Sequence, residues 1–533
     1  MTRRFTLYLS QIMEKIKILW ADDEIDFLKS HITYLEEKGY SVQAVTNGRD
    51  ALDKVREEIF DVVFLDESMP GLTGLETLSE IKKMKSNLPV VLITKNEEED
   101  LMEDAIGSQI ADYLIKPVKP QQIILTLKKI IDNKRLVSQK TTQAYQQEFQ
   151  NLFMTIQSVT DYKEWINLYK TLVYWELELD SSDSSEMAEI LEMQKKEANI
   201  EFNKFIIKNY LSWMSNPNAE STPALSHTIF KRKVFSVLKK EKPTFLFLID
   251  NLRYDQWKMI EPYFHDNFEA VEEDTFFSIL PTATQYSRNS IFAGMTPLEI
   301  SKKLPQYWLN DDEEGGKNMF EKDLLAHQLS KNFKDPVKHS YTKVLTLEEG
   351  STLTNNVQNL LHNTLNVIVY NFVDMISHSR TEMELMKELA KDERAFRSLT
   401  MTWFDHSNMR NLLQKLASKD VNIIVMTDHG TTQVRRPSKC VGDRLTSTNI
   451  RYKAGKNLQF NEKDVFVVKK PEDAQLPQAN LSTSYIFAKE DAFLIYQNNY
   501  NSFVNFFKDS FQHGGISLDE MIIPFAVFQS KKR

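Results

Sequence analysis

Cysteine is almost absent from this chain: Cys440 is the only one in 533 residues. One cysteine cannot form an intrachain disulfide, and a zinc module built on several cysteine ligands is excluded. No run reaches the roughly 18 consecutive apolar residues of a transmembrane helix. The apolar stretch in MTRRFTLYLSQI is too short and broken for a signal peptide. These absences predict a cytoplasmic protein with no membrane insertion.

An excess of basic charge is also absent. The formal net charge is −9 and there is no long basic run, which argues against a non-specific nucleic-acid binder. Hydrophobic residues make up 41% and charged residues 26%, as in ordinary globular proteins, and the length predicts two to four domains. The segment MEKIKILWADDE reads as a complete domain opening, so Met13 is an alternative start.

Three zones are predicted, and the overall class is α/β. Residues 1–133 contain a βαβαβ rhythm that predicts a five-stranded parallel sheet with helices on both faces. Residues 134–240 lack glycine and carry apolar residues at helical spacing, which predicts a helical bundle that connects two domains. Its many aromatic residues disfavour a flexible linker. Strand–helix alternation returns over residues 241–533 and predicts a large α/β/α domain.

Charged and hydroxyl side chains follow the strands of the first zone. Asp22 and Asp23 follow one strand, and Asp66, Thr94 and Lys116 end three others. The carboxyl ends of neighbouring parallel strands converge on one crevice. Three clustered carboxylates would recruit a hard cation such as Mg²⁺, and Asp66 would act as a nucleophile that forms an acyl phosphate.

The segments WADDE, FLDESMPGLTG, LITK and YLIKP resemble the receiver domain of response regulators. The resemblance implies that Asp66 accepts the phosphoryl group and that Asp22 and Asp23 are the acidic pair. It also implies that Thr94 is the switch hydroxyl and Tyr113 the switch aromatic. Lys116 would be the phosphate ligand, followed by a cis peptide bond to Pro117. The backbone carbonyl of Glu67 would be a ligand of magnesium.

Aspartate and histidine residues follow the strands of the last zone. These positions are Asp250, Asp374 with His378 four residues later, Asp428 with His429 in TDHG, and His513 in QHGG. Zinc sites made of histidine and carboxylate need ligands fixed at strand ends or in loops. Three aspartates and three histidines suffice for two metals if one more oxygen ligand is present.

The segment PTATQYS offers that oxygen at the start of a predicted helix. Thr284 is the favoured ligand and nucleophile because of its position in the motif. At this place helix N-terminal amides favour an anion, and a bound metal would lower the pKa of the hydroxyl. Thr282, two residues earlier, stays open as the alternative. Arg253 and Arg288 are predicted near this pocket, either as phosphate contacts or as members of surface salt bridges.

This set of residues resembles the alkaline phosphatase superfamily, and PTATQYS looks like the nucleophile segment of its phosphodiesterase branch. The resemblance implies two zinc ions, one on Asp374, His378 and His513. The other would bind Asp250, Thr284, Asp428 and His429. A sulfatase is disfavoured because Cys440 lies far from the nucleophile segment.

The whole arrangement resembles PorX-type response regulators, in which a PglZ domain replaces a DNA-binding output. That implies a phosphodiesterase acting on nucleotide or oligonucleotide substrates, with no direct DNA-binding domain, that regulates type IX secretion and gliding motility. The implied partners are a sensor histidine kinase, an extracytoplasmic-function sigma factor, and a second copy on phosphorylation. Two alternatives stay open: a phosphorylation-dependent interaction scaffold with a structural or ligand-sensing zinc site, and a phosphomutase or monoesterase.

Overall fold

The computed structural model describes residues 16–85, 88–95, 110–182, 185–311, 313, 315–442, 446–478, 480 and 482–531, with the backbone alone at 131–139, 182, 185, 380–382 and 384. The alternative start at Met13 lies outside these residues. By contacts the chain forms two compact units, Met1–Thr141 and Thr142–Arg533.

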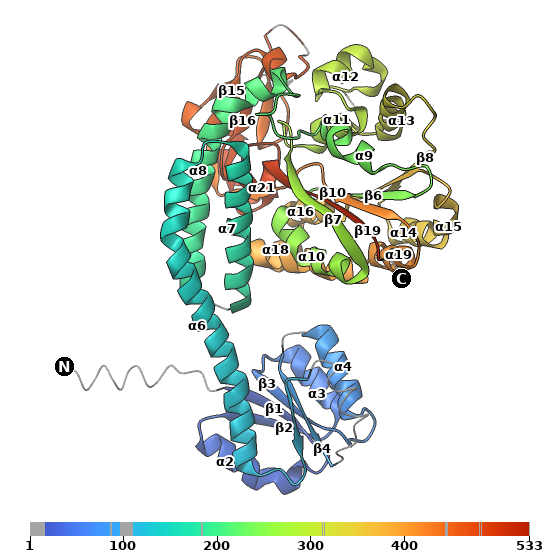
Figure 1. The fold of residues 1–533 in the computed structure, drawn as a ribbon. Coiled ribbons are helices and arrows are strands. Elements are labelled where there is room, and N and C mark those ends of the chain that lie inside the picture. The colour runs from blue at the N-terminus through green and yellow to red at the C-terminus, as the bar shows by residue number, and fades with distance from the viewer. Residues whose placement is uncertain are drawn as a thin grey trace, which may run out of the picture. The chain divides into compact units, whose positions relative to one another are not determined.

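The first unit contains the predicted five-stranded sheet, which is confirmed (Figure 1). The strands are β1 (Lys17–Ala21), β2 (Ser41–Val45), β3 (Val62–Asp66), β4 (Val90–Thr94) and β5 (Asp112–Ile115). They are ordered β2-β1-β3-β4-β5, and every neighbouring pair is parallel. β3 and β4 are buried along their whole length, as expected for a parallel sheet covered on both faces.

Helices of the first unit begin at caps that the local sequence supplies. They are η1 (Ile25–Leu28), α2 (Lys29–Glu37), α3 (Gly48–Glu57) and α4 (Gly74–Met84). Asn47 accepts a hydrogen bond from Asp50 N at α3, and Thr73 forms a capping box with Glu76 at α4. Alternate residues of β1 and β3 belong to two separate apolar clusters, so the sheet buries a core on each face.

The predicted helical middle region is confirmed. It comprises α6 (Pro120–Ser158), which begins in the first unit and ends in the second, then α7 (Tyr162–Ser182) and α8 (Ser185–Ser215). The Tyr145 hydroxyl donates to Gln194 Oε1 at 2.9 Å, which joins α6 to α8. The Tyr169 hydroxyl on α7 donates to Asp519 Oδ1 at 2.8 Å. By contacts, α7 and α8 belong to the larger unit, Thr142–Arg533.

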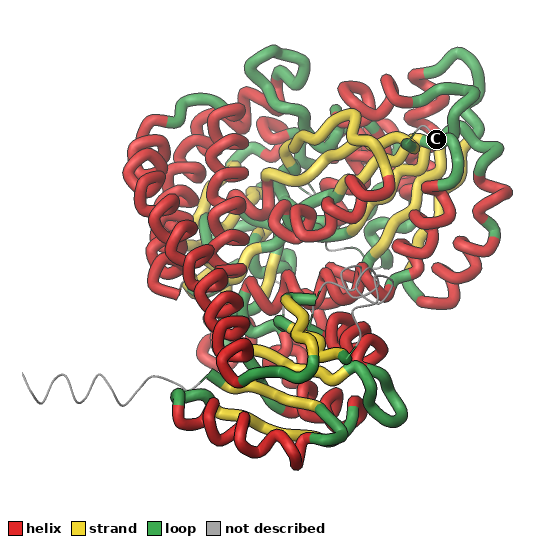
Figure 2. Tube along the Cα trace, turned by 60° about the horizontal axis from the view of Figure 1, so that its bottom comes forward, coloured by secondary structure: helices red, strands yellow, loops and turns green. Residues whose placement is uncertain are grey.

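The C-terminal α/β region is built on a six-stranded sheet ordered β7-β19-β10-β6-β9-β8. Its strands are β6 (Thr244–Ile249), β7 (Phe268–Phe277), β8 (His339–Val344), β9 (Leu365–Tyr370), β10 (Asn422–Met426) and β19 (Ile522–Ser530). β10, β6, β9 and β8 are parallel, whereas β19 pairs antiparallel with both β10 and β7. Helices flank the sheet (Figure 2), so the predicted α/β class is confirmed.

The helices of this region are α9 (Phe235–Val237), α10 (Tyr254–Asn267), α11 (Thr284–Ala293), α12 (Pro297–Lys303), α13 (Glu321–Asn332), α14 (Leu347–Asn355), α15 (Val357–Leu360), α16 (Phe372–Glu382), α17 (Glu384–Leu389), α18 (Glu393–His406), α19 (Asn408–Ala417), α20 (Tyr500–Phe507) and α21 (Leu518–Met521). Shorter turns are η2 (Phe230–Val234), η3 (Pro305–Tyr307), η4 (Glu462–Asp464) and η5 (Pro471–Ala474).

Three small sheets complete the C-terminal region. Their strands are β11 (Thr432–Gln433) with β18 (Phe511–Gln512), then β12 (Arg436–Val441), β14 (Gln459–Phe460) and β17 (Ala492–Tyr496), then β13 (Tyr452–Gly455), β15 (Val465–Val468) and β16 (Ser484–Ala488). Among the helices that the structure describes, none combines the length and the apolar character needed to cross a bilayer.

Candidate two-metal site and receiver site

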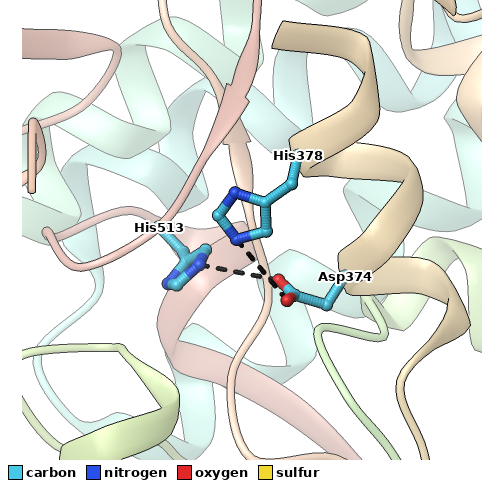
Figure 3. A group of neighbouring side chains, drawn as sticks. All are labelled: Asp374, His378 and His513. Atoms are coloured by element: carbon cyan, nitrogen blue, oxygen red, sulfur yellow. Dashed lines mark ion pairs between the residues drawn. The ribbon is translucent and has the colours of Figure 1, made fainter. Parts of the chain in front are cut away.

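The predicted C-terminal ligands gather in two groups of three. In the first, Asp374 Oδ2 lies 3.5 Å from His378 Nε2, and Asp374 Oδ1 lies 3.6 Å from His513 Nε2 (Figure 3). The second consists of Asp250, Asp428 and His429, all fully buried. The ligand atoms of each group lie within 4.8 Å of one another, close enough for one cation to contact all three. We call them the first and the second ligand group.

The secondary structure that carries these ligands differs from the prediction at one position. Asp250 directly follows β6, and Asp428 and His429 follow β10, as expected for strand-end ligands. Asp374 was also predicted to follow a strand, and this is wrong. β9 ends at Tyr370, and Asp374 lies in the first turn of α16, so His378 stands one helical turn further along the same helix.

Backbone hydrogen bonds orient two of the imidazole rings. His513 Nδ1 lies 3.1 Å from the Thr282 carbonyl, and His429 Nδ1 lies 3.1 Å from the Gly430 carbonyl. If each Nδ1 carries the proton, each Nε2 presents a lone pair to its ligand group, which is how metal-binding histidines are commonly held. The rings of His429 and His513 stack with centroids 4.2 Å apart, so the two groups adjoin each other.

The structure separates the two candidate threonines. Thr284 is the first residue of α11, and its Oγ lies 3.1 Å from His429 Nε2 and 3.4 Å from Asp250 Oδ1. Thr282 is fully buried, its Oγ donates to the Gly515 carbonyl at 2.9 Å, and it accepts from Gly514 N at 3.0 Å. Thr282 therefore supports the loop that carries His513, and Thr284 faces the second ligand group.

Two arginines form buried ion pairs instead of surface ones, so the surface prediction is wrong. Arg288 is fully buried, and its guanidinium lies 2.7 Å from Asp250 Oδ2 and 2.6 Å from Glu321 Oε1. Arg253 is equally buried and pairs with Asp255 at 2.9 Å. Arg288 thus contacts a carboxylate of the second ligand group, and its ion pair with Glu321 fixes its orientation.

The charges in the second group shift the protonation of its carboxyls. Burial raises the pKa of Asp428 to about 6, and the neighbouring charge of Asp250 adds to the shift. Burial would also raise the pKa of Asp250, but Arg288 and His429 outweigh it and hold that pKa below its usual value. Asp428 Oδ2 is buried without a hydrogen-bond partner. Its nearest cationic groups, on Arg288 and His429, lie 3.8 and 3.7 Å away. A buried carboxylate oxygen without a hydrogen bond is costly, so a bound cation would stabilise this atom.

The first group favours a neutral imidazole. Burial holds the pKa of His513 well below its usual range, and the nearby His429 and His378 add to the effect. Burial raises the pKa of Asp374, and Asp250 contributes to the shift. A neutral histidine is a ready metal ligand, because no proton has to be displaced. The oxygen and nitrogen donors of both groups match those that zinc accepts.

The residues of the predicted phosphorylation site also lie close together. Asp22, Asp23 and Asp66 offer carboxylate oxygens within 4.8 Å of one another. Lys116 Nζ lies 2.7 Å from Asp66 Oδ1 and 3.0 Å from Asp22 Oδ2. Burial raises the pKa of Asp66, Lys116 opposes that shift, and Asp22 and Asp23 add to it. The cluster of hard oxygen donors fits a magnesium ion.

The remaining receiver residues lie around this cluster. Thr94 ends β4 and is buried, Tyr113 on β5 is 40% exposed, and the peptide bond between Lys116 and Pro117 is cis, as predicted. The Glu67 carbonyl accepts a hydrogen bond from Gly74 N at 3.0 Å. A carbonyl oxygen has a second lone pair, so this hydrogen bond does not decide the role of Glu67 as a magnesium ligand, which stays a prediction.

Comparison with known protein families assigns all three regions. Residues 229–528 match the model of the BREX system PglZ alkaline phosphatase-like domain. The chain belongs to the PglZ family. Residues 18–128 match the response regulator receiver domain, and residues 135–214 match the linker domain of PorX response regulators. This order of parts is that of a PorX-type response regulator with a PglZ domain.

The curated relatives resemble the receiver region of this PglZ regulator. They include the transcriptional regulatory protein ZraR of Klebsiella oxytoca, 37% identical over 140 residues, which covers 26% of this chain and 31% of that protein. The CpxR homolog of Haemophilus influenzae is 37% identical over 117 residues, covering 22% of this chain and 50% of that protein. The chain thus spans about a third of the first relative and half of the second.

Two solved structures are each similar to about a fifth of this chain. A receiver domain from Clostridium thermocellum is 32% identical and covers 22% of this chain and 97% of its own, with a TM-score of 0.22. A LuxR-family DNA-binding response regulator from Staphylococcus aureus is 29% identical, covering 22% and 98%, with a TM-score of 0.21.

Two residues of the PglZ domain escaped the prediction from sequence. Glu321 fixes Arg288 from α13, and no local pattern marks it. Asn251 follows Asp250 and has a φ of +65°. Asparagine tolerates this left-handed conformation better than most residues. An asparagine directly after a strand-end aspartate was therefore the available signal.

Proposed function

We propose that the protein is a response regulator whose PglZ domain is a two-zinc phosphodiesterase that acts on nucleotide or oligonucleotide phosphodiesters. One observation carries this proposal: the Thr284 hydroxyl lies at the N-terminus of α11 within 3.4 Å of Asp250 and His429. A nucleophile beside two groups of metal-ligand type is the arrangement that phosphoryl transfer requires.

The chain's own residues supply the nucleophile and its orientation. Thr284 Oγ would form a bond to phosphorus while the bond to one ester oxygen breaks and that oxygen takes a proton from water. A second water would then cleave the bond between Thr284 Oγ and phosphorus and release a phosphate monoester. Asp250 Oδ1 and His429 Nε2 contact the hydroxyl, but as zinc ligands they could not accept its proton, which would pass to water. Amides of the first turn of α11 favour the negative charge of the phosphoryl group. Bound zinc ions would supply Lewis-acid stabilisation of the attacking and leaving oxygens.

The input belongs to the receiver. Asp66 would accept a phosphoryl group from a sensor histidine kinase in a magnesium-dependent reaction, with Lys116 beside the developing charge. Phosphorylation would shift the receiver between two states and promote pairing of two copies. The linker match to PorX regulators supports extending the proposal to a cytoplasmic regulator of type IX secretion and gliding motility, with an extracytoplasmic-function sigma factor as partner.

Metal analysis combined with turnover tests this proposal. The full-length protein is stripped with a chelator, reloaded with zinc, and assayed for zinc content and for cleavage of a bis-aryl phosphodiester. We expect about two zinc ions per chain, with turnover lost on chelation and restored by zinc. Two bound zinc ions without turnover would instead favour the interaction scaffold, and a preference for a monoester would favour the monoesterase.

A further inference from the structure

Asn251 occupies an unusual position between the two ligand groups. It directly follows Asp250, its side chain is fully buried, and its backbone has a φ of +65°. This left-handed conformation turns the chain immediately after β6. As a result, the backbone amide and the side-chain amide of the same residue each contact a ligand of a different group.

The contacts are made to carboxylates of both groups. Asn251 N lies 3.4 Å from Asp428 Oδ1 in the second group. Asn251 Nδ2 donates to Asp374 Oδ1 at 3.3 Å in the first group and to Ser377 Oγ at 3.0 Å. Ser377 Oγ itself donates to the Val373 carbonyl at 3.3 Å, so it can accept from the asparagine. The reverse amide orientation would set Asn251 Oδ1 against a carboxylate oxygen, which is repulsive.

The first group needs such a support because its ligands come from different parts of the fold. Asp374 and His378 lie on α16, whereas His513 lies in the loop after β18. Both partners of the Asn251 amide, Asp374 and Ser377, are on α16, and Asn251 itself extends from the end of β6. The amide therefore connects the helix that carries two of the three ligands of the first group to the strand end that carries Asp250.

We infer that Asn251 is a positioning residue that sets the zinc affinity of the first ligand group. The inference rests on the proposed two-zinc site and adds the residue that couples its two halves. Hydrogen-bond partners of metal ligands typically contribute about tenfold to a hundredfold in metal affinity. The loss of the amide should weaken zinc binding at Asp374, His378 and His513, and leave the second group close to its original affinity.

Stepwise zinc titration against a chromophoric chelator tests this in the full-length protein. His378→Ala and Asp428→Asn each remove one ligand, and so assign one binding step to each group. Asn251→Gly removes the amide and permits the left-handed backbone, whereas Asn251→Ala removes it and strains the backbone. We expect both substitutions to weaken the first-group step by about tenfold to a hundredfold. We expect only Asn251→Ala to lower the melting temperature of the metal-free protein appreciably.

Asn203→Ala is the matched control. Asn203 is a buried asparagine of α8 whose side-chain amide donates to a backbone carbonyl. Its Oδ1, like that of Asn251, lacks a hydrogen-bond partner. Its substitution should leave both zinc steps unchanged. Wild-type zinc affinity of both steps in Asn251→Gly would overturn the inference, as would a loss confined to Asn251→Ala, which would assign the effect to backbone strain.

The outcome also distinguishes this inference from the proposed activity. If the wild-type protein binds two zinc ions but cleaves no diester, the proposed activity fails, while the affinities of the Asn251 variants still decide the positioning role. If the wild-type protein binds no zinc, both are overturned.

Discussion

The two phosphate-handling sites proposed for this chain use a cation in different ways. In the receiver, Lys116 contacts Asp66 and Asp22, and its side chain is 17% exposed. In the PglZ domain, Arg288 contacts Asp250 and is fully buried, with Glu321 fixing its guanidinium from the other side. Both sites lie at the carboxyl ends of parallel strands, where ligand sites of open α/β sheets are found.

This difference indicates how each site works. A lysine on a flexible stem is a mobile point charge that can follow an added phosphoryl group. A buried arginine held by two carboxylates is fixed, so it orients Asp250 instead of moving with the substrate. The receiver site is therefore suited to switching, and the PglZ site to holding a preformed geometry.

The largest expected effect is that acyl-phosphate formation and diester cleavage can each be abolished without the other. Asp66→Asn should abolish formation of the acyl phosphate from acetyl phosphate, because the amide is not a nucleophile, yet it should leave zinc-dependent diester cleavage intact. Thr284→Ala serves as the reciprocal control and should still be phosphorylated. Radiolabel incorporation and its lability to base measure the acyl phosphate. Label retained in Asp66→Asn would place the acceptor elsewhere.

The next effect concerns the nucleophile. Thr284→Ala should lower turnover of a bis-aryl phosphodiester by at least about a thousandfold, because nucleophile removal costs that much or more in related covalent mechanisms. Zinc content should stay near the wild-type value, since the six aspartate and histidine ligands remain. Turnover within tenfold of wild type would show that another group attacks phosphorus.

Buried ion pairs connect α7 to α18 and α10, and breaking them should cost stability. Arg397 is 3% exposed and contacts Asp255 at 2.8 Å as well as Glu176 on α7. Arg397→Met leaves Asp255 paired only with Arg253, and Glu176 only with Lys195. We therefore expect a loss at the low end of the roughly 3–5 kcal/mol that breaking a buried ion pair typically costs. Urea denaturation measures the loss. Lys240→Met breaks an exposed pair with Asp335 and should change the midpoint too little to resolve.

The smallest expected effect is a pH dependence. Burial holds the pKa of His227 at about 4 in the folded chain, and both ring nitrogens lack hydrogen-bond partners. The unfolded chain, with a pKa near 6.5, binds more protons between pH 6.5 and 4. Stability is therefore full above pH 6.5 and falls on acidification, by about 3 kcal/mol for this group.

His227→Leu should reduce the fall in the free energy of unfolding on acidification. The measurement is the difference in free energy of unfolding between wild type and variant at pH 7.5 and at pH 4.5, which removes the contributions of other titrating groups. An equal difference at both pH values would mean that His227 titrates normally.

Much of this organisation could be predicted from local sequence. The five receiver strands, the helical middle region and the second α/β region follow from apolar periodicity. Asp22, Asp66, Asp250 and Asp428 could be found because each lies at the end of a buried strand or within two residues of it, and parallel strands bring their carboxyl ends to one edge. Position along the chain is then enough to predict proximity.

Only the tertiary structure decided the rest. The sequence favours Thr284 over Thr282 but leaves Thr282 open. The structure separates the two, because Gly514 and Gly515 hydrogen-bond to Thr282 while His429 faces Thr284. The burial of Arg288 depends on Glu321, 33 residues away. The contact of Asn251 with Asp374 spans 123 residues. Such contacts arise from packing between distant segments, so no local pattern encodes them, whereas the ligand order at strand ends was determined by the sequence itself.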